Sequence, residues 1–314
     1  MVAKRRPRVL VTLLVPLLFG LLLLHLGGCK RSTSGSGEGL SGRIKIDGSS
    51  TVFPVTEAVA EEFQKKERRV QVTVGVSGTG GGFEKFTRGE IDIVNASRPV
   101  KDHEKKIAAD NNLDYVELEI ALDGLSVVVS RANDFVESLT VNELKKIWET
   151  ESAVAEWKDI RSEWPAERIK LFGPGTDSGT FDYFTEAIVG REGASRSDYT
   201  ASEDDNVLVD GVASTDNSLG YFGYAYYSEN KGRLKVVGVD NGDGPVEPTV
   251  ETIRSGKYAP LSRPLLIYVR ADALKRPEAR AFVEFYLEQA ASLAEEVGYV
   301  PLPDADYREQ LEDL

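Results

Sequence analysis

Three glycine-rich turns, each placed between an apolar strand and the start of a helix, constrain the fold of this chain most. They are residues 48–52 (GSSTV), 77–82 (SGTGGG) and 173–180 (GPGTDSGT). Short apolar runs alternate with amphipathic segments around them, which is typical of an α/β fold. Such a turn lets backbone N–H groups point outward at the positive end of a helix dipole. One of them alone is most often a plain helix cap, whereas three together predict a site for a small oxyanion.

The predicted elements show no repeat of fixed period. Helix 54–66 carries Val55, Val59 and Phe63 on one face, which predicts that this face is buried. In the strand predicted at 70–76, the even-numbered valines share one face. The other predicted strands are 43–47, 91–95, 125–130, 169–172, 234–239 and 265–269, and the other predicted helices are 83–88 and 278–297.

The composition narrows the classes of function. A length of 314 residues suggests about two domains of roughly 150 residues each. Asp and Glu outnumber Lys and Arg by 51 to 38, a formal net charge of −13, so the chain would repel a nucleic acid. Two histidines and one cysteine do not suffice for a His-rich metal site, a Ser-His-Asp hydrolase of the usual kind or a disulfide scaffold. We therefore expect neither a metal nor a cofactor.

The N-terminal segment predicts the compartment. Four basic residues among the first eight precede an apolar run over 9–26, which ends in Leu26-Gly27-Gly28-Cys29. Hydropathy alone would allow a membrane helix, whereas the order basic, apolar, small is typical of an export signal. Because the ending resembles a bacterial lipobox, we expect residues 1–28 to be a lipoprotein signal peptide, Cys29 to carry the lipid and residues 29–41 to form a flexible tether. Both interpretations place the remaining chain outside the cytoplasm.

A fourth segment adds a positive charge near the turns. Residues 95–99 (NASRP) end the predicted strand 91–95 and put the Arg98 guanidinium beside a serine hydroxyl. The planar guanidinium donates two parallel hydrogen bonds and suits a tetrahedral oxyanion. A surface salt bridge is the ordinary alternative for an arginine. The position between a strand end and Pro99 favours a role in binding the ligand.

Six motifs, taken in order, resemble the periplasmic phosphate-binding proteins of ABC transporters, the PstS family. They are 48–54 (GSSTVFP), 77–83 (SGTGGGF), 95–99 (NASRP), 121–125 (ALDGL), 178–181 (SGTF) and 220–224 (GYFGY), and the similarity runs from about residue 42 to 302. The resemblance implies a class II periplasmic solute-binding fold, in which two α/β lobes are joined by two crossing strands with the ligand cleft between them. We expect residues 42–124 and 270–314 to form lobe one, and residues 125–269, with the crossing strands, to form lobe two.

The same resemblance implies a function without chemistry. The protein would capture inorganic phosphate outside the cytoplasm as a monomer and deliver it to the permease of an ABC importer. The ligand groups expected from the matching motifs, together with the arginine, are Ser50, Thr51, Val52, Thr79, Arg98, Ser178, Gly179 and Thr180. Family members place an aspartate where this chain has Arg98, and an arginine where it has Pro174. The positive charge has moved from one lobe to the other, which resembles a divergent branch.

This departure leaves open which carboxylate accepts the proton of the ligand. Phosphate near neutral pH carries a proton that sulfate lacks, so a buried carboxylate would bind phosphate and repel sulfate. The candidates are Asp205, Asp177 and Asp123. Asp205 ranks first, because Asp177 is equally well explained as a helix cap.

Two other functions remain as alternatives. The same fold could bind another oxyanion, such as sulfate or molybdate. The tetrapeptide at 177–180 (DSGT) matches the one that aspartic proteases use, but their chemistry needs two carboxylates that share a proton. A second copy is not present in the sequence, so we expect a binding protein rather than an enzyme.

Overall fold

Strands and helices alternate along the chain. The structure, a computed structural model, describes residues 39–176 and 178–314. The strands are β1 (Ser41–Gly48), β2 (Arg69–Val74), β3 (Ile93–Ala96), β4 (Tyr115–Ser130), β5 (Ser138–Thr140), β6 (Lys170–Pro174), β7 (Thr200–Ser202), β8 (Ser218–Gly223), β9 (Leu234–Val236), β10 (Gly238–Asp240), β11 (Pro245–Val246) and β12 (Ser262–Arg270). The α-helices are α1 (Phe53–Lys66), α2 (Gly78–Thr87), α3 (Asp102–Asp110), α4 (Val141–Trp148), α5 (Gly179–Phe184), α6 (Asp205–Ser214), α7 (Tyr224–Glu229), α8 (Val250–Arg254), α9 (Pro277–Glu296) and α10 (Asp304–Glu312). The predicted α/β class is confirmed.

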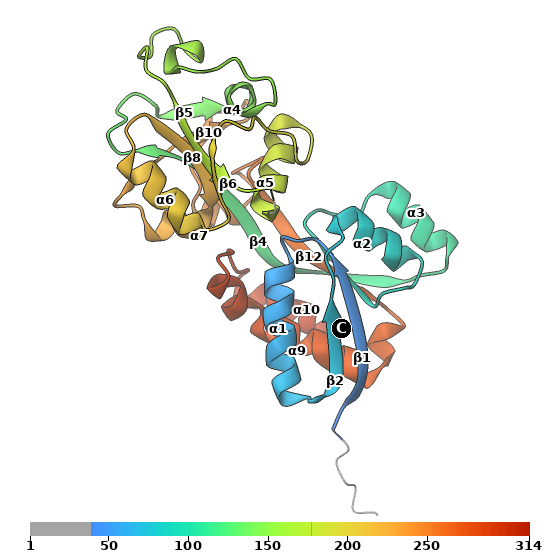
Figure 1. The fold of residues 1–314 in the computed structure, drawn as a ribbon. Coiled ribbons are helices and arrows are strands. Elements are labelled where there is room, and N and C mark those ends of the chain that lie inside the picture. The colour runs from blue at the N-terminus through green and yellow to red at the C-terminus, as the bar shows by residue number, and fades with distance from the viewer. Residues whose placement is uncertain (1–38, 177) are drawn as a thin grey trace, which may run out of the picture. The chain divides into compact units, whose positions relative to one another are not determined.

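The first lobe is built on a sheet with the strand order β2-β1-β3-β12-β4. Strand β1 runs parallel to β2 and β3, whereas β12 runs antiparallel to β3 and β4. Helices α1 and α9 pack against each other, and α2 packs on β1, β3 and α3 (Figure 1). The predicted helix at 83–88 begins earlier, at Gly78, whose φ is +74°.

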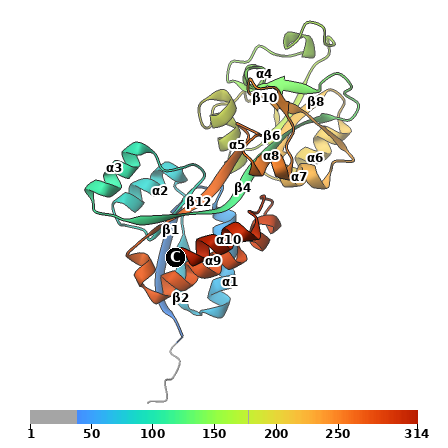
Figure 2. The same cartoon turned by 180° about the vertical axis from the view of Figure 1, so that it is seen from behind.

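The second lobe continues the sheet through β4, β8, β6 and β7, and β9 also pairs with β4. Strand β6 runs parallel to both of its neighbours. Helix α6 packs on β8, β6 and β4. A separate small sheet has the order β11-β10-β5 and lies near α4 in the views of Figure 1 and Figure 2.

Strands β4 and β12 connect the two lobes, and they confirm the predicted two-lobed class II fold. Residues 115–124 of β4 pair with β12, and residues 125–129 pair with β8 in the second lobe. All of β12 pairs with the first-lobe half of β4, and its residues 266–269 also pair with β3. The strand 265–269, expected in lobe two, therefore lies in the first-lobe sheet. Hydropathy could not assign this strand to a lobe, because the buried run 265–269 would suit the sheet of either lobe.

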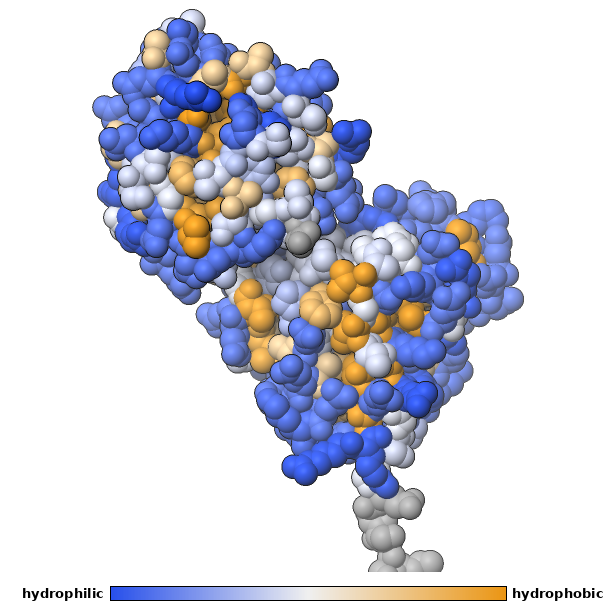
Figure 3. Space-filling view, viewed as in Figure 1, coloured by the Kyte–Doolittle hydropathy of each residue, from blue (hydrophilic) through white to orange (hydrophobic). Residues whose placement is uncertain are grey.

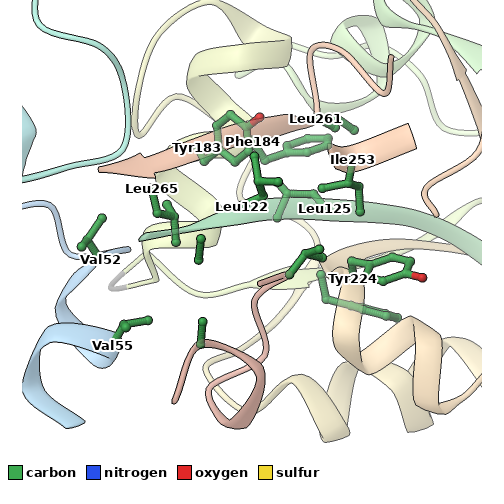
Figure 4. Close-up of a cluster of buried hydrophobic side chains, with 14 of the residues drawn as sticks. Val52, Val55, Leu122, Leu125, Tyr183, Phe184, Tyr224, Ile253, Leu261 and Leu265 are labelled. Atoms are coloured by element: carbon green, nitrogen blue, oxygen red, sulfur yellow. The ribbon is translucent and has the colours of Figure 1, made fainter. Parts of the chain in front are cut away.

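One apolar core runs through both lobes. It contains Val55 and Phe63 of α1 as well as Trp148 and Phe184 of the second lobe. Near the crossing strands, this core includes Val52, Val55, Leu122, Leu125 and Leu265 (Figure 4). The crossing strands therefore lie in a close-packed core, in which the loss of even one methyl group would lower the stability of the fold.

The surface is largely hydrophilic. In Figure 3, strongly polar residues cover most of the visible face, and the surface where the lobes meet is paler. Only four large apolar side chains of the described residues are more than about a third exposed, namely Val76, Ile107, Val207 and Val250. Within residues 39–176 and 178–314, no helix is long and apolar enough to cross a membrane. The N-terminal apolar run and Cys29 lie outside the described residues.

Candidate anion-binding site

A cleft of about 570 Å³ opens between the two lobes. The first lobe contributes Ser49, Ser50, Thr51, residues 76–81, Ser97, Arg98 and Lys101; the second lobe contributes Asp182, Tyr183, Glu186 and Glu192; the crossing strand β12 contributes Arg263. Four of the predicted ligand residues, Ser50, Thr51, Thr79 and Arg98, therefore line one cavity.

The first turn carries the chain from β1 into α1. Gly48 has a φ of +139°, and a Cβ there would lie 2.1 Å from the backbone oxygen of Asn95, so this close approach requires glycine. The Ser49 N–H donates to the same oxygen at 2.9 Å. The Val52 side chain is buried in the core, and Val52 gives α1 no side-chain cap. The Phe53 N–H donates to the Ser49 carbonyl at 3.1 Å, and Pro54 has no N–H, so the donors of this turn lie before α1 rather than in its first turn.

In the second turn, the Thr79 hydroxyl contacts Ser97, the residue that follows β3. Thr79 Oγ1 lies 3.1 Å from Ser97 Oγ and accepts the Ser97 N–H at 3.2 Å. Ser77, the N-cap of α2, makes no side-chain bond to the first turn of that helix. Thr79, Ser97 and the start of α2 consequently face the cleft together. Free helix N–H groups beside hydroxyl groups favour the binding of an anion.

Arg98 borders the cleft, but its hydrogen-bond donors are largely occupied. Its two terminal nitrogens donate to the two oxygens of Glu104 at 2.9 and 2.7 Å, and Nη1 also donates to the Pro99 carbonyl at 3.0 Å. Burial would raise the pKa of Glu104, but the bonds from Arg98 and the Lys101 N–H outweigh it and lower that pKa. The Arg98 charge is thus already paired within the first lobe.

Arg263 is the arginine that sequence reasoning missed. Its Nη2 donates to Thr51 Oγ1 at 2.8 Å, and its Nε donates to Asp123 Oδ2 at 3.2 Å. The guanidinium carbon lies 3.6 Å from the ring centroid of Tyr183. Among the described residues, none accepts a hydrogen bond from Nη1. A charged residue two positions before the predicted apolar strand 265–269 was a signal that could have identified Arg263.

The third turn meets the first turn across the cleft. A Cβ at Gly179 would lie 2.7 Å from Thr51 Oγ1 and 3.1 Å from Ser50 Oγ. Ser178 caps α5 by accepting the Thr180 N–H at 3.1 Å. Ser178 and Thr180 are absent from the lining formed by the described residues.

The carboxylates near the cleft differ in environment. Asp182 lines it, and burial together with Glu192 raises the pKa of Asp182. Asp123 is buried, and burial raises its pKa although Arg263 partly offsets the effect. Asp205 begins α6 outside the lining, and burial next to Asp204 and Glu203 raises the pKa of Asp205 to about 6.

Two aspartates remain, Asp177, which was predicted, and Asp182, which was not. Asp177 lies outside the described residues. Asp182 was not among the predicted carboxylates, since a single aspartate inside a helix carries no pattern. In the described part of the chain, no three His, Cys, Asp or Glu side chains are grouped to hold a metal ion.

Comparison with known proteins identifies the family. Residues 33–290 match the PBP superfamily domain. Protein SphX of Synechocystis sp. is 51% identical over 290 residues, which cover 91% of this chain and 84% of that protein. Phosphate-binding protein PstS of Staphylococcus saprophyticus is 44% identical over 296 residues, covering 94% and 90%. The crystal structure of a possible phosphate binding protein from Planctomyces limnophilus matches with a TM-score of 0.84 and 50% identity, covering 87% of this chain and 97% of that one.

These matches extend over nearly the whole chain and over both lobes. The prediction that the chain is not an enzyme is confirmed, because its relatives are binding proteins along the same length. The expected resemblance to the phosphate-binding proteins of ABC transporters is likewise confirmed at the level of the family. The chain belongs to the PBP superfamily and, within it, to the PstS family of phosphate-binding proteins.

Proposed function

We propose that this protein captures inorganic phosphate outside the cytoplasm and delivers it to an ABC importer. The observation that carries the proposal is Arg263, which projects into the cleft beside Thr51 and has no acceptor for Nη1 among the described residues. A protein with a net charge of −13 attracts an anion only where positive charge is gathered locally. The names of the PstS relative and of the Planctomyces structure support phosphate as that anion.

Binding needs only a few good contacts. The proposed set comprises the Arg263 guanidinium, the hydroxyl groups of Ser50, Thr51 and Thr79, the backbone N–H groups of Thr51 and Val52, and the first N–H groups of α2. A hydrogen bond to a charged group contributes roughly 1.5–3 kcal/mol, and a micromolar site requires about 8 kcal/mol. Four or five such bonds therefore suffice once the two lobes enclose the anion.

The second lobe contributes through its contact with the first turn. Gly179 lies against Ser50 and Thr51, so its backbone can approach the anion without a side chain between them. In this proposal Arg98 is not a principal ligand, because Glu104 and Pro99 already accept from it.

Selectivity against sulfate would come from a carboxylate that accepts the phosphate proton. Asp182 lines the cleft, Asp123 contacts the lining residue Arg263, and Asp205 is not among the lining residues of the described chain. Replacing each with Asn and measuring the ratio of phosphate to sulfate affinity assigns the role. The residue that accepts the phosphate proton is the one whose Asn variant binds phosphate more weakly and has a smaller ratio of phosphate to sulfate affinity. Unchanged ratios in all three variants would exclude these carboxylates.

The direct test is calorimetry of the full chain in mild detergent with phosphate, sulfate and molybdate. We expect saturable binding of phosphate with an affinity in the micromolar range or tighter and much weaker binding of the other two. Preferential binding of sulfate or molybdate would favour the alternative oxyanion function. We further propose that the protein is a lipoprotein anchored through Cys29, because of the segment that precedes this residue.

A further inference from the structure

We infer that Asp47 is a positioning residue that keeps the start of α2 open toward the cleft. Asp47 lies at the end of β1, one residue before Gly48. It is not among the residues that line the cleft in the described chain. The inference concerns how the proposed phosphate site is prepared before the anion arrives, and it therefore rests on the proposed function.

Asp47 joins three groups around the first two turns. Its Oδ1 accepts the Gly48 N–H at 2.7 Å and the Ser77 hydroxyl at 2.7 Å. Its Oδ2 accepts from Lys85 Nζ at 2.5 Å. Burial would raise the pKa of Asp47, but the bonds from Lys85 and Ser77 outweigh it, so the pKa is lowered. The carboxylate is therefore ionised at neutral pH and ties both ends of α2 to β1.

The consequence appears when α2 is compared with the other helices. Five α-helices of the described chain have Ser, Thr or Asp at the N-cap, namely Ser77 of α2, Thr140 of α4, Ser178 of α5, Asp204 of α6 and Thr249 of α8. In four of them the N-cap side chain accepts an N–H from the first turn of its own helix, at 2.9 to 3.1 Å. Ser77 is the exception, because its hydroxyl bonds to Asp47 instead.

The backbone of Ser77 agrees with this arrangement. Its φ of −126° and ψ of 14° differ from the extended geometry at Thr140, Ser178 and Thr249. A capping serine would satisfy the N–H of Thr79 or Gly80. With the hydroxyl held by Asp47, those N–H groups lack this internal acceptor, and both residues line the cleft. Asp47 thus preserves donors that an anion can use.

The inference predicts an interaction between two substitutions. In Asp47→Ala the freed Ser77 hydroxyl should turn to cap α2 and compete with the anion. In Asp47→Ala/Ser77→Ala no hydroxyl is present at residue 77 to compete with the anion, so the N–H groups of Thr79 and Gly80 should again be available to bind it. Asp92→Ala is the matched control, since Asp92 also accepts a backbone N–H on the first-lobe sheet and pairs with a cation, Arg276.

The experiment measures two quantities on the full chain. In the ligand-free protein, hydrogen exchange of the Thr79 and Gly80 amides should slow about tenfold in Asp47→Ala and return to the wild-type rate in the double variant. The dissociation constant for phosphate should rise about tenfold in Asp47→Ala and stay within about threefold of wild type in Ser77→Ala and in the double variant. Asp92→Ala should change neither quantity.

Two results would overturn the inference. One is unchanged exchange of both amides in Asp47→Ala, and the other is a double variant that binds as weakly as Asp47→Ala. The second result is also what a purely structural role predicts, because the double variant lacks the same carboxylate. If the exchange pattern is as expected but wild type does not bind phosphate, the proposed function fails while the role of Asp47 at α2 stands.

Discussion

Arg263 and Asp123 lie opposite each other on the two strands that join the lobes, and Nε of the arginine is 3.2 Å from Oδ2 of the aspartate. Only 11% of the Arg263 side chain and 3% of the Asp123 side chain are exposed. The pair lies where β4 passes from one lobe to the other. The Arg263 guanidinium is therefore held at the junction of the two lobes. An anion bound by Arg263 is therefore linked directly to the region about which the lobes would close.

The first prediction concerns the stability of this pair. Arg263→Met leaves the buried Asp123 carboxylate unpaired, which should lower the free energy of unfolding by about 3 kcal/mol at pH 7.5. Lower pH should relieve the loss, because protonation removes the buried charge. Arg263→Met/Asp123→Asn should recover most of the stability at pH 7.5. Urea unfolding of the three proteins measures this, and an equally unstable double variant would show that packing dominates.

The second prediction compares the two arginines as phosphate ligands. Arg263→Met/Asp123→Asn and Arg98→Met/Glu104→Gln each remove one ion pair without leaving a charge behind. The first should raise the dissociation constant for phosphate about 30-fold, equivalent to about 2 kcal/mol. The second should raise it less than about fivefold, because Glu104 already accepts from Arg98. Calorimetry that gives the reverse order would restore Arg98 as the principal ligand.

The third prediction concerns the contact between the first and third turns. The added Cβ in Gly179→Ala would lie 2.7 Å from Thr51 Oγ1, so the turns must separate. We expect the dissociation constant for phosphate to rise at least about tenfold, with little change in thermal stability. The control is Gly232→Ala, where a Cβ meets nothing within 4 Å. Equal affinities of the two variants would contradict a role for this close approach.

The fourth prediction concerns pH. Because the pKa of Asp205 is raised to about 6 in the folded protein, the folded state holds a proton that the unfolded state has released between about pH 4 and pH 6. The contribution of Asp205 to the free energy of unfolding should therefore fall as pH rises through this range. Asp205→Asn should be more stable than wild type by about 1–2 kcal/mol at pH 7.5 and similar at pH 4. Urea unfolding at both values tests this, and a constant difference across pH would refute it.

The fifth prediction concerns the anchor. If Cys29 is the lipid-modified first residue of the mature protein, Cys29→Ser should abolish lipid labelling and either release the protein from membranes or block its processing. Fractionation and metabolic labelling with a fatty acid separate these outcomes. A simple helical anchor would give a different result. The wild-type protein would then carry no lipid and would stay in the membrane with segment 1–28 still attached.

The sequence alone determined the local parts of this protein. The helix 54–66, the alternating valines of 70–76 and the glycine-rich turns were predictable, because side-chain periodicity and glycine content act over a few residues. The motif order also predicted the two-lobed fold. The lobe to which β12 belongs was not predictable, since an apolar run does not specify which strands it pairs with.

Only the tertiary structure decided which polar groups meet in the cleft. Arg263 and Asp123 are 140 residues apart, and they meet because the register of β12 against β4 places them opposite each other. Arg98 looked like a free guanidinium in the motif, but Glu104 from the following helix pairs with it. Whether a charged side chain is free for a ligand depends on every partner within a few ångströms, and that distance is set by the packing of segments remote in the sequence.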